Sequence, residues 1–165
     1  MDRKLKLLSK PISDLLLIQV THELENYMLY NMFSNFFALE NILPLEEYYH
    51  KRAHEEMVHH NWIVDYLQEA DCLLTYPTPN IQNTAKTLID PFILTVNKEI
   101  ETTQMIYKIA EVALEEKDFM TFNWLNQHLI PEQIEEENTS RMARQIMELD
   151  ADLLEKSEQI LKLLK

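Results

Sequence analysis

Tyr76-Pro77-Thr78-Pro79-Asn80 lies near the middle of the chain, inside a stretch from Asp71 to Asn83 that cannot continue a helix. Proline lacks a backbone N–H and disfavours helical geometry in the residue before it. The connection is about 13 to 18 residues long, depending on whether the next helix begins near Thr84 or Asp90. At ~3.3 Å per extended residue it spans roughly 43 to 59 Å, more than the ~40 Å of a neighbouring helix. A structureless connection of that length favours a crossover along a helical bundle.

Apolar residues recur at three- and four-residue steps on both sides of this connection, which predicts helices. The expected helices cover about residues 11 to 40, 45 to 68, 84 or 90 to 116, 119 to 147 with a kink or interruption at Pro131, and 150 to 165. Short breaks near residues 41–44 and 117–118 make the first two helices antiparallel neighbours, and likewise the third and fourth. The sequence therefore predicts an all-α four-helix bundle with one long crossover and a short C-terminal fifth helix. Its 165 residues are expected to form a single domain.

The composition excludes several classes of function. There is no glycine, against an average of about 7%, so phosphate-cradling loops and dinucleotide fingerprints are absent. The 15 Lys plus Arg and 28 Asp plus Glu give a net charge of −13, which argues against nucleic-acid binding. The single cysteine, Cys72, excludes an internal disulfide or a cysteine-based metal site. No membrane helix and no secretory signal in Met1–Ser9 is expected, so the chain is predicted to be cytoplasmic.

Each of the four bundle helices carries a carboxylate on its apolar face. A lone carboxylate in a core is costly, and such groups protonate, pair or bind metal. Oxygen ligands with one imidazole suit iron, manganese or zinc, and several carboxylates that can bridge suit a pair of ions better than one. The residues are Glu23 on the first helix, Glu56 with His59 on the second, Glu99 on the third, and Gln133 with Glu136 on the fourth.

The spacing of these residues from the turns tests whether they converge. Glu99 lies 18 residues before Lys117 and Glu136 lies 18 after Asp118, so they are expected at the same height. For Glu23 and Glu56 the register leaves a mismatch of roughly 7 Å at ~1.5 Å per residue, which an asymmetric turn must absorb. Arg52, one turn before Glu56, is the only nearby candidate on these faces to neutralise the cluster.

A metal-free helical bundle with solvent-facing glutamates is the alternative interpretation of this pattern. Residues 54 to 59, His-Glu-Glu-Met-Val-His, differ from a zinc-protease helix, because that motif needs histidines at i and i+4. The other histidines, namely His22, His50, His60 and His128, are expected at the surface or at helix edges.

Several stretches of the chain together resemble bacterial non-haem ferritins, over nearly its whole length. They are His22-Glu23-Leu24 with Tyr30, Glu55-Glu56-Met57-Val58-His59, Lys98-Glu99, Lys117-Asp118-Phe119-Met120-Thr121-Phe122-Asn123-Trp124-Leu125, and Glu132-Gln133-Ile134-Glu135-Glu136-Glu137. The last two are the most specific, because a turn and a ligand helix agree in order and spacing. Gln133-x-x-Glu136 on the fourth helix, in place of a second Glu-x-x-His, argues against bacterioferritin and rubrerythrin.

The resemblance implies a fold, a ligand set and an activity. Two iron ions per subunit would be held by Glu23, Glu56 and His59 and by Glu56, Glu99 and Glu136, with Gln133 nearby and Tyr30 supplying an electron. A third, peripheral iron would use Glu55, Glu132, Glu135 and Glu136, and no haem is expected. The implied function is iron storage with ferroxidase activity, which oxidises Fe2+ with O2 or H2O2 and stores ferric mineral in a homo-24-mer.

Three further expectations stand beside this resemblance. A ferritin-like di-metal protein that scavenges peroxide or performs redox protection without a cage is an alternative function. Family members usually place glycine in their loops, so in this chain Asn41, Asn80, Asp118 and Asp150 are expected to take the special backbone conformations. Pro131, just before Glu132, is expected to distort the peripheral position.

Overall fold

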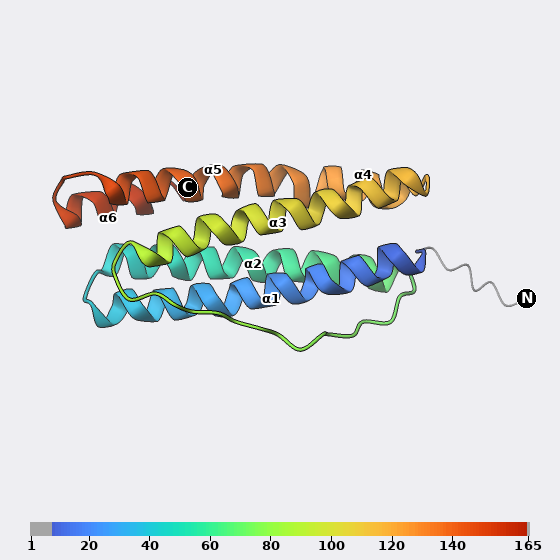
Figure 1. Ribbon diagram of the computed structural model, residues 1–165, viewed down its shortest axis with the longest axis horizontal. Helices are drawn as coiled ribbons and strands as arrows, with labels where there is room; N and C mark the ends of the chain where they lie inside the picture. Colours follow the sequence, from blue (N-terminus) through green and yellow to red (C-terminus); the bar gives the residue numbers. More distant parts are fainter. Residues whose placement is uncertain (1–7, 165) are drawn as a thin grey trace, which may run out of the picture.

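The computed structural model describes residues 8 to 164, and the N-terminal stretch expected to lack a secretory signal falls mostly outside this range. The helices are α1 (Lys10–Leu39), α2 (Leu43–Glu69), α3 (Asp90–Glu115), α4 (Phe119–Gln127), α5 (Leu129–Glu148) and α6 (Leu153–Leu161). Figure 1 shows α1, α2, α3 and the rod formed by α4 and α5 lying side by side along one long axis. This arrangement confirms the all-α four-helix bundle. No described helix meets the length and hydropathy that a membrane span requires.

Proline and short polar residues set the helix starts. Pro11, Pro44 and Pro91 each lie in the first turn of a long helix, where a missing N–H costs nothing. Ser9 caps α1 by accepting a hydrogen bond from the backbone N–H of Ile12 at 3.4 Å. These local signals, which are visible in the sequence, place the N-terminal ends of α1, α2 and α3 close to where they were expected.

The three long helices end in the same way, without glycine. Asn41, Asp71 and Lys117 each follow a helix and take φ values of 60°, 55° and 59°. In each case the next residue donates its N–H to a carbonyl five residues back, as Asp118 does to Ala113 at 2.8 Å. This is the Schellman ending, which glycine normally provides. The expectation is confirmed for Asn41; it is wrong for Asn80, Asp118 and Asp150, whose φ angles are not positive.

The rod formed by α4 and α5 is interrupted, as expected, but at His128 rather than at Pro131. His128 has φ −119° and ψ −71° and belongs to neither helix. Pro131 then lies in the first turn of α5, because its ring cannot follow a continuous helical turn but fits near a helix start. Asp118 caps the N-terminus of α4, accepting from the N–H of Thr121 at 3.0 Å.

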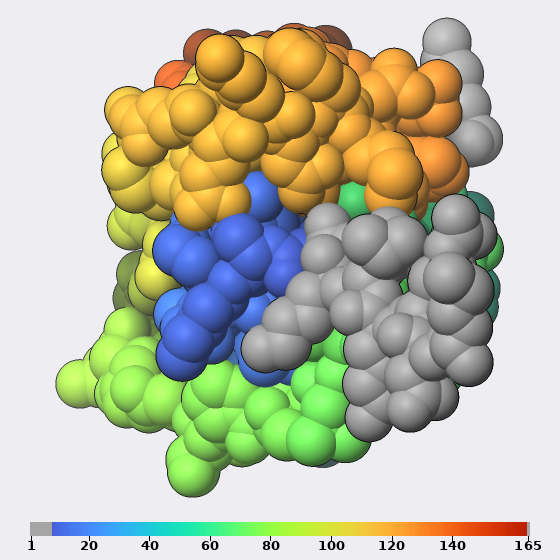
Figure 2. Space-filling model, turned by 90° about the vertical axis from the view of Figure 1, so that its right-hand side faces the viewer, coloured from blue at the N-terminus to red at the C-terminus, as the bar shows by residue number. Residues whose placement is uncertain are grey.

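The connection between α2 and α3 runs along α1 and α2 from one end of the bundle to the other (Figure 1). It extends from residue 70 to residue 89, longer than the expected 13 to 18 residues, because α3 begins at Asp90 and not at Thr84. The Asp90 carboxylate accepts from the N–H groups of Lys86 and Thr87, which holds the turn before the helix. Figure 2 shows the crossover residues beneath the start of α1 at one end of the molecule, with the α3–α4 turn above.

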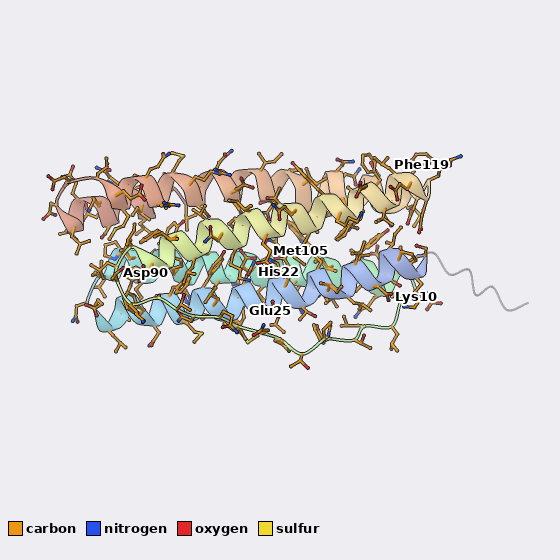
Figure 3. All side chains as sticks on the ribbon, in the orientation of Figure 1. Lys10, His22, Glu25, Asp90, Met105 and Phe119 are labelled. Carbon is orange, nitrogen blue, oxygen red and sulfur yellow. The ribbon has the colours of Figure 1, made fainter. Side chains whose placement is uncertain are left out.

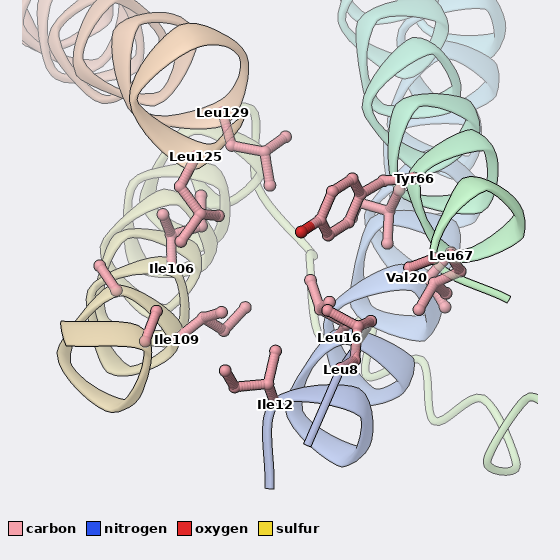
Figure 4. Packing of buried hydrophobic residues seen from close by; sticks show 14 residues of the cluster. Leu8, Ile12, Leu16, Val20, Tyr66, Leu67, Ile106, Ile109, Leu125 and Leu129 are labelled. Carbon is pink, nitrogen blue, oxygen red and sulfur yellow. The ribbon is translucent and has the colours of Figure 1, made fainter. Parts of the chain in front are cut away.

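The interior divides into two apolar clusters. One cluster joins the start of α1 to the end of α2, the second half of α3 and α4, through residues such as Ile12, Leu16 and Ile109 (Figure 4). The other is aromatic and surrounds Phe37 and Tyr49, whose rings stack at 5.6 Å. Between the clusters, at the middle of each rod, the buried side chains are polar. This polar layer contains the candidate site.

The short C-terminal helix α6 turns back along α5 and also contacts α2. Ile160 is fully buried against the aromatic cluster. The Lys156 ammonium donates to the carbonyls of Met147 and Leu149 at 3.1 and 2.9 Å. A cation at the carbonyl end of a helix is favourable, so α6 both covers the core and caps α5.

Candidate metal centre

The polar layer is built from one turn of each rod. Glu23 lies between Val20 and Leu29 on α1, and each of its counterparts is likewise flanked by apolar core residues one or two turns away. Helical periodicity therefore forces these side chains inward together with their apolar neighbours. The layer comprises Glu23, Glu56, His59, Glu99, Gln133 and Glu136, all with 5% exposure or less.

One group in the layer consists of Glu23, Glu56 and His59, whose ligand atoms lie within 4.8 Å of one another. Within residues 8–164, Glu23 Oε2 and Glu56 Oε1 are buried and have no hydrogen-bond partner. A buried polar oxygen without a partner costs about 1–3 kcal/mol. Two such oxygens beside an imidazole form a donor set that fits a divalent cation. The register mismatch expected between Glu23 and Glu56 is thus absorbed, and the two residues converge.

The second group consists of Glu56, Glu99 and Glu136, again with ligand atoms within 4.8 Å of one another. Glu136 Oε2 also lacks a hydrogen-bond partner among the described residues. It lies 3.6 Å from His59 Nδ1, so the two groups share one continuous cluster. Glu56 belongs to both groups, in the position expected of a bridging ligand.

Arg52 lies inside this cluster, only 1% exposed. Its Nη2 donates to Glu99 Oε1 at 2.5 Å, and its Nη1 lies 3.6 Å from Glu136 Oε1. Its Nη2 is also 4.0 Å from Glu56 Oε1. The guanidinium therefore faces all three carboxylates of the second group. The expectation that Arg52 is the nearby cation is confirmed.

Glu99 receives two further hydrogen bonds from the protein. The Tyr30 hydroxyl donates to Oε1 at 2.6 Å, and the Gln133 amide donates to Oε2 at 2.9 Å. Tyr30 thus touches the centre, as expected from the resemblance. Gln133 contacts it through its amide nitrogen, as a hydrogen-bond donor to a ligand.

Burial dominates the proton affinities in the cluster. Desolvation raises the pKa of Glu23 from its usual 4.5 to about 7, and it lowers the pKa of His59 to about 4. Desolvation, together with Glu99 and Glu136, raises the pKa of Glu56 well above its usual range. Burial alone would lower the pKa of Arg52, but Glu99 and Glu136 raise it well above its usual value. The carboxylates therefore need a cation to stay ionised, and Arg52 supplies only one charge.

The residues expected to hold a peripheral ion lie at the edge of the bundle. Glu55, Glu132, Glu135 and Glu136 line one open cavity together with Arg52 and Thr139. Glu132 and Glu135 are exposed, and the Glu55 side chain is 40% exposed. Water screens such groups, so this position differs in kind from the buried cluster. Pro131 does not displace Glu132 from the cavity.

His22 corrects one expectation, because it is buried instead of lying at the surface. It lies at mid-length of α1 (Figure 3), and its Nε2 hydrogen-bonds Thr102 Oγ1 on α3 at 2.7 Å. Desolvation lowers the pKa of His22 to about 4. His22 is therefore a neutral structural residue between α1 and α3. His50 is exposed, as expected.

Comparison with known proteins agrees with the fold. A family model described as a ferritin-like domain matches residues 13–149. A bacterial non-heme ferritin of Staphylococcus haemolyticus is 28% identical over 136 residues, covering 81% of this chain and 80% of the relative. Another, of Staphylococcus epidermidis, is 33% identical over 95 residues; the match covers 56% of this chain and spans little more than half of that relative, 55%.

Solved structures show the same architecture. A Chlorobium tepidum ferritin superposes with a TM-score of 0.81 at 29% identity, covering 85% of each chain. An open pore ferritin from Archaeoglobus fulgidus superposes with a TM-score of 0.85, covering 96% of this chain and 99% of the other, and its 21% identity supports the fold alone. Because the family model matches most of the chain and the four-helix architecture agrees with it, this protein belongs to the ferritin family.

Proposed function

We propose that this chain is an iron-storage ferritin that oxidises Fe2+ to Fe3+ at the buried carboxylate cluster. The observation that carries the proposal is the set of unpartnered buried oxygens on Glu23, Glu56 and Glu136, between two apolar clusters. Such oxygens are unfavourable unless a proton or a cation occupies the space they face. Iron is the substrate and cargo, and membership of the ferritin family supports its identity.

The ligand chemistry favours oxidation. Carboxylates supply negative charge, which stabilises Fe3+ more than Fe2+. Each Fe2+ gives up one electron, and O2 accepts two electrons and two protons to give H2O2; where H2O2 is the oxidant, it accepts two electrons and two protons to give water. The first ion would be held by Glu23, Glu56 and His59, and the second by Glu56, Glu99 and Glu136. The Tyr30 hydroxyl, 2.6 Å from Glu99, lies close enough to supply an electron.

The exposed acidic cavity offers a route out of the centre. Glu136 belongs to the buried cluster and also lines the cavity with Glu55, Glu132 and Glu135. A ferric ion that leaves the second position would meet this third set of oxygens, as the resemblance implies. Storage would follow in a cavity enclosed by 24 copies, whose formal charge of about −312 (24 × −13) attracts cations.

The ferroxidase proposal is tested by the growth of ferric absorbance after Fe2+ is added in air. Replacing both Glu56 and His59 by Ala removes two ligands of the first position, and the fast phase of oxidation should disappear. The matched control replaces Glu47 and His50 by Ala, since this pair has the same residue types on the exposed side of α2. The control should oxidise iron at the unaltered rate. Equal rates for both double variants would contradict the proposal.

A further inference from the structure

Arg52 places a positive charge among the carboxylates of the second group. Its guanidinium is 1% exposed and faces Glu56, Glu99 and Glu136, which are all the members of the second group. It does not make a salt bridge with Glu23 or His59 of the first group within the described residues. The guanidinium therefore faces every member of the second group, whereas of the first group it meets only the shared Glu56.

Glu99, which belongs only to the second group, is the carboxylate of the centre with the most hydrogen bonds. Both its oxygens already accept from protein donors: Oε1 from Arg52 and Tyr30, and Oε2 from Gln133. Glu23, which belongs only to the first group, accepts one bond, from Gln19 to Oε1 at 2.6 Å, and its Oε2 has no partner among the described residues, as is also true of Glu56 Oε1 and Glu136 Oε2. A metal ion at the second position therefore competes with more protein donors than one at the first. Displacing charge-assisted hydrogen bonds is costly.

The charge balance of the buried side chains also disfavours a second divalent ion. Four ionised carboxylates, Glu23, Glu56, Glu99 and Glu136, carry −4, and Arg52 reduces this to −3. One divalent ion leaves −1, but a second gives +1 in a buried site. Glu55 also pairs with Arg52, at 3.1 Å, but its side chain is 40% exposed, so water screens much of its charge. The second divalent ion therefore enters a site that the first ion and Arg52 have nearly neutralised.

We propose that Arg52 acts as a positioning residue that stands in for the second metal ion, so that the centre binds one ion tightly and a second only when Arg52 leaves Glu99. This inference rests on the proposed function and concerns the metal affinity of the two positions. A first Fe2+ would stay bound to Glu23, Glu56 and His59 until a second ion competes with the Arg52 guanidinium for Glu99. The pair needed for oxidation would then assemble only when Fe2+ is plentiful.

The test is an anaerobic calorimetric titration of the metal-free protein with Mn2+, which is not oxidised under these conditions. The unaltered protein should bind one ion tightly and a second at least about tenfold more weakly. Arg52→Gln should raise the second affinity by about tenfold or more, because a guanidinium within ~4–6 Å lowers a carboxyl's proton affinity by ~10- to 1,000-fold. The first affinity should change much less.

Two further variants separate charge from packing. Lys51→Gln removes one positive charge from the adjacent residue, whose side chain is 47% exposed, and should leave both binding steps unaltered. Arg52→Met fills similar space without charge and should behave like Arg52→Gln if the Gln variant does not fold.

The outcomes distinguish this inference from the proposed function. Two steps of equal affinity in the unaltered protein, or an unaltered second step in a folded Arg52 variant, overturn the role of Arg52 while the metal centre stands. A titration in which no variant binds Mn2+ at the buried cluster overturns both.

Discussion

Burial shifts the proton affinities of several side chains at the centre. Desolvation raises the pKa of Glu23 to about 7 and raises the pKa of Glu136 well above its usual range. It lowers the pKa values of His22 and His59 to about 4. Glu23 and Glu136 therefore hold protons more strongly than free carboxyls, and a divalent ion must compete with those protons.

These pKa shifts predict how the stability of the metal-free protein depends on pH. Unfolded histidines lose their proton near pH 6.5, whereas folded His22 and His59 are already neutral, so these two residues raise the stability as pH rises. Glu23 keeps a proton in the folded chain up to about pH 7, whereas the unfolded chain loses it near pH 4.5, so at this residue the folded state binds more protons. The contribution of Glu23 to the free energy of unfolding should therefore fall between pH 6.5 and 8, by roughly 0.8 kcal/mol. Urea unfolding in the presence of a chelator measures it.

Glu23→Gln provides the control for this pH dependence. Glutamine cannot ionise, so the stability of the unaltered protein relative to this variant should fall between pH 6.5 and 8, while the contributions of the histidines cancel in the comparison. Saturating Mn2+ should reverse this difference, because the metal binds the ionised carboxylates more strongly as pH rises. A difference that stays constant or rises over this range in the metal-free proteins would refute the raised pKa of Glu23.

The sequence predicted the inward-facing residues well and their partners less well. Glu23, Glu56, Glu99 and Glu136 follow the apolar period of their helices, and this period is enough to place them inside. His22 was misplaced because α1 contacts both α2 and α3, so adjacent residues Glu23 and His22 are both covered, by different neighbours. The bonds of Arg52 to Glu99 and Glu136 join residues 47 and 84 positions away, and no local pattern encodes such contacts.

At the scale of helices, the endings show how a chain without glycine folds. The left-handed conformation costs a residue with a Cβ atom roughly 1–2 kcal/mol, although Asn and Asp tolerate it better. Asn41 and Asp71 follow that preference, whereas Lys117, with φ 59°, does not. The expected positions were wrong where an Asp served another purpose: Asp118 caps the N-terminus of α4 instead of ending α3.

Lys117→Gly should therefore stabilise the protein. Glycine adopts φ near 60° without steric cost, and the gain should be about 0.5–1 kcal/mol after the entropy that glycine adds to the unfolded chain. Lys117→Ala removes the same charge but keeps the Cβ atom, so it should give no comparable gain. Urea unfolding of the three proteins at one chain concentration makes the comparison. A glycine variant no more stable than the alanine variant would show that the α3 ending is unstrained.

At the scale of the whole molecule, the crossover is attached to the bundle by side-chain contacts, and large apolar side chains lie exposed on the surface. The crossover is fastened to the rods by the Glu25 carboxylate, which accepts from the N–H of Asn80 at 2.7 Å, and by the His60–Tyr76 ring stack. Several large apolar side chains stay exposed in the isolated chain, including Leu39, Leu73 and Phe119. The crossover was predictable because prolines forbid a helix there, but its attachments to α1 and α2 depend on tertiary contacts.

The cage is tested by particle mass. Twenty-four copies of a 19.7 kDa chain give about 470 kDa (24 × 19.7 kDa), and light scattering coupled to size exclusion should find this species. Each particle should hold far more iron after aerobic loading than the centres alone can bind. A species of one or two chains that still oxidises Fe2+ would favour the redox protein without a cage over storage.

We propose that the buried carboxylates meet at mid-bundle because cations bind between them, and anomalous diffraction from crystals soaked in Zn2+ tests this directly. We expect a peak at ~2.0–2.2 Å from the oxygens of Glu23 and Glu56 and the imidazole of His59, which is the usual zinc–ligand distance. A second, weaker peak should lie among Glu56, Glu99 and Glu136. Zinc bound only at exposed carboxylates, with no density inside the polar layer, would contradict the metal centre and the ferroxidase proposal with it.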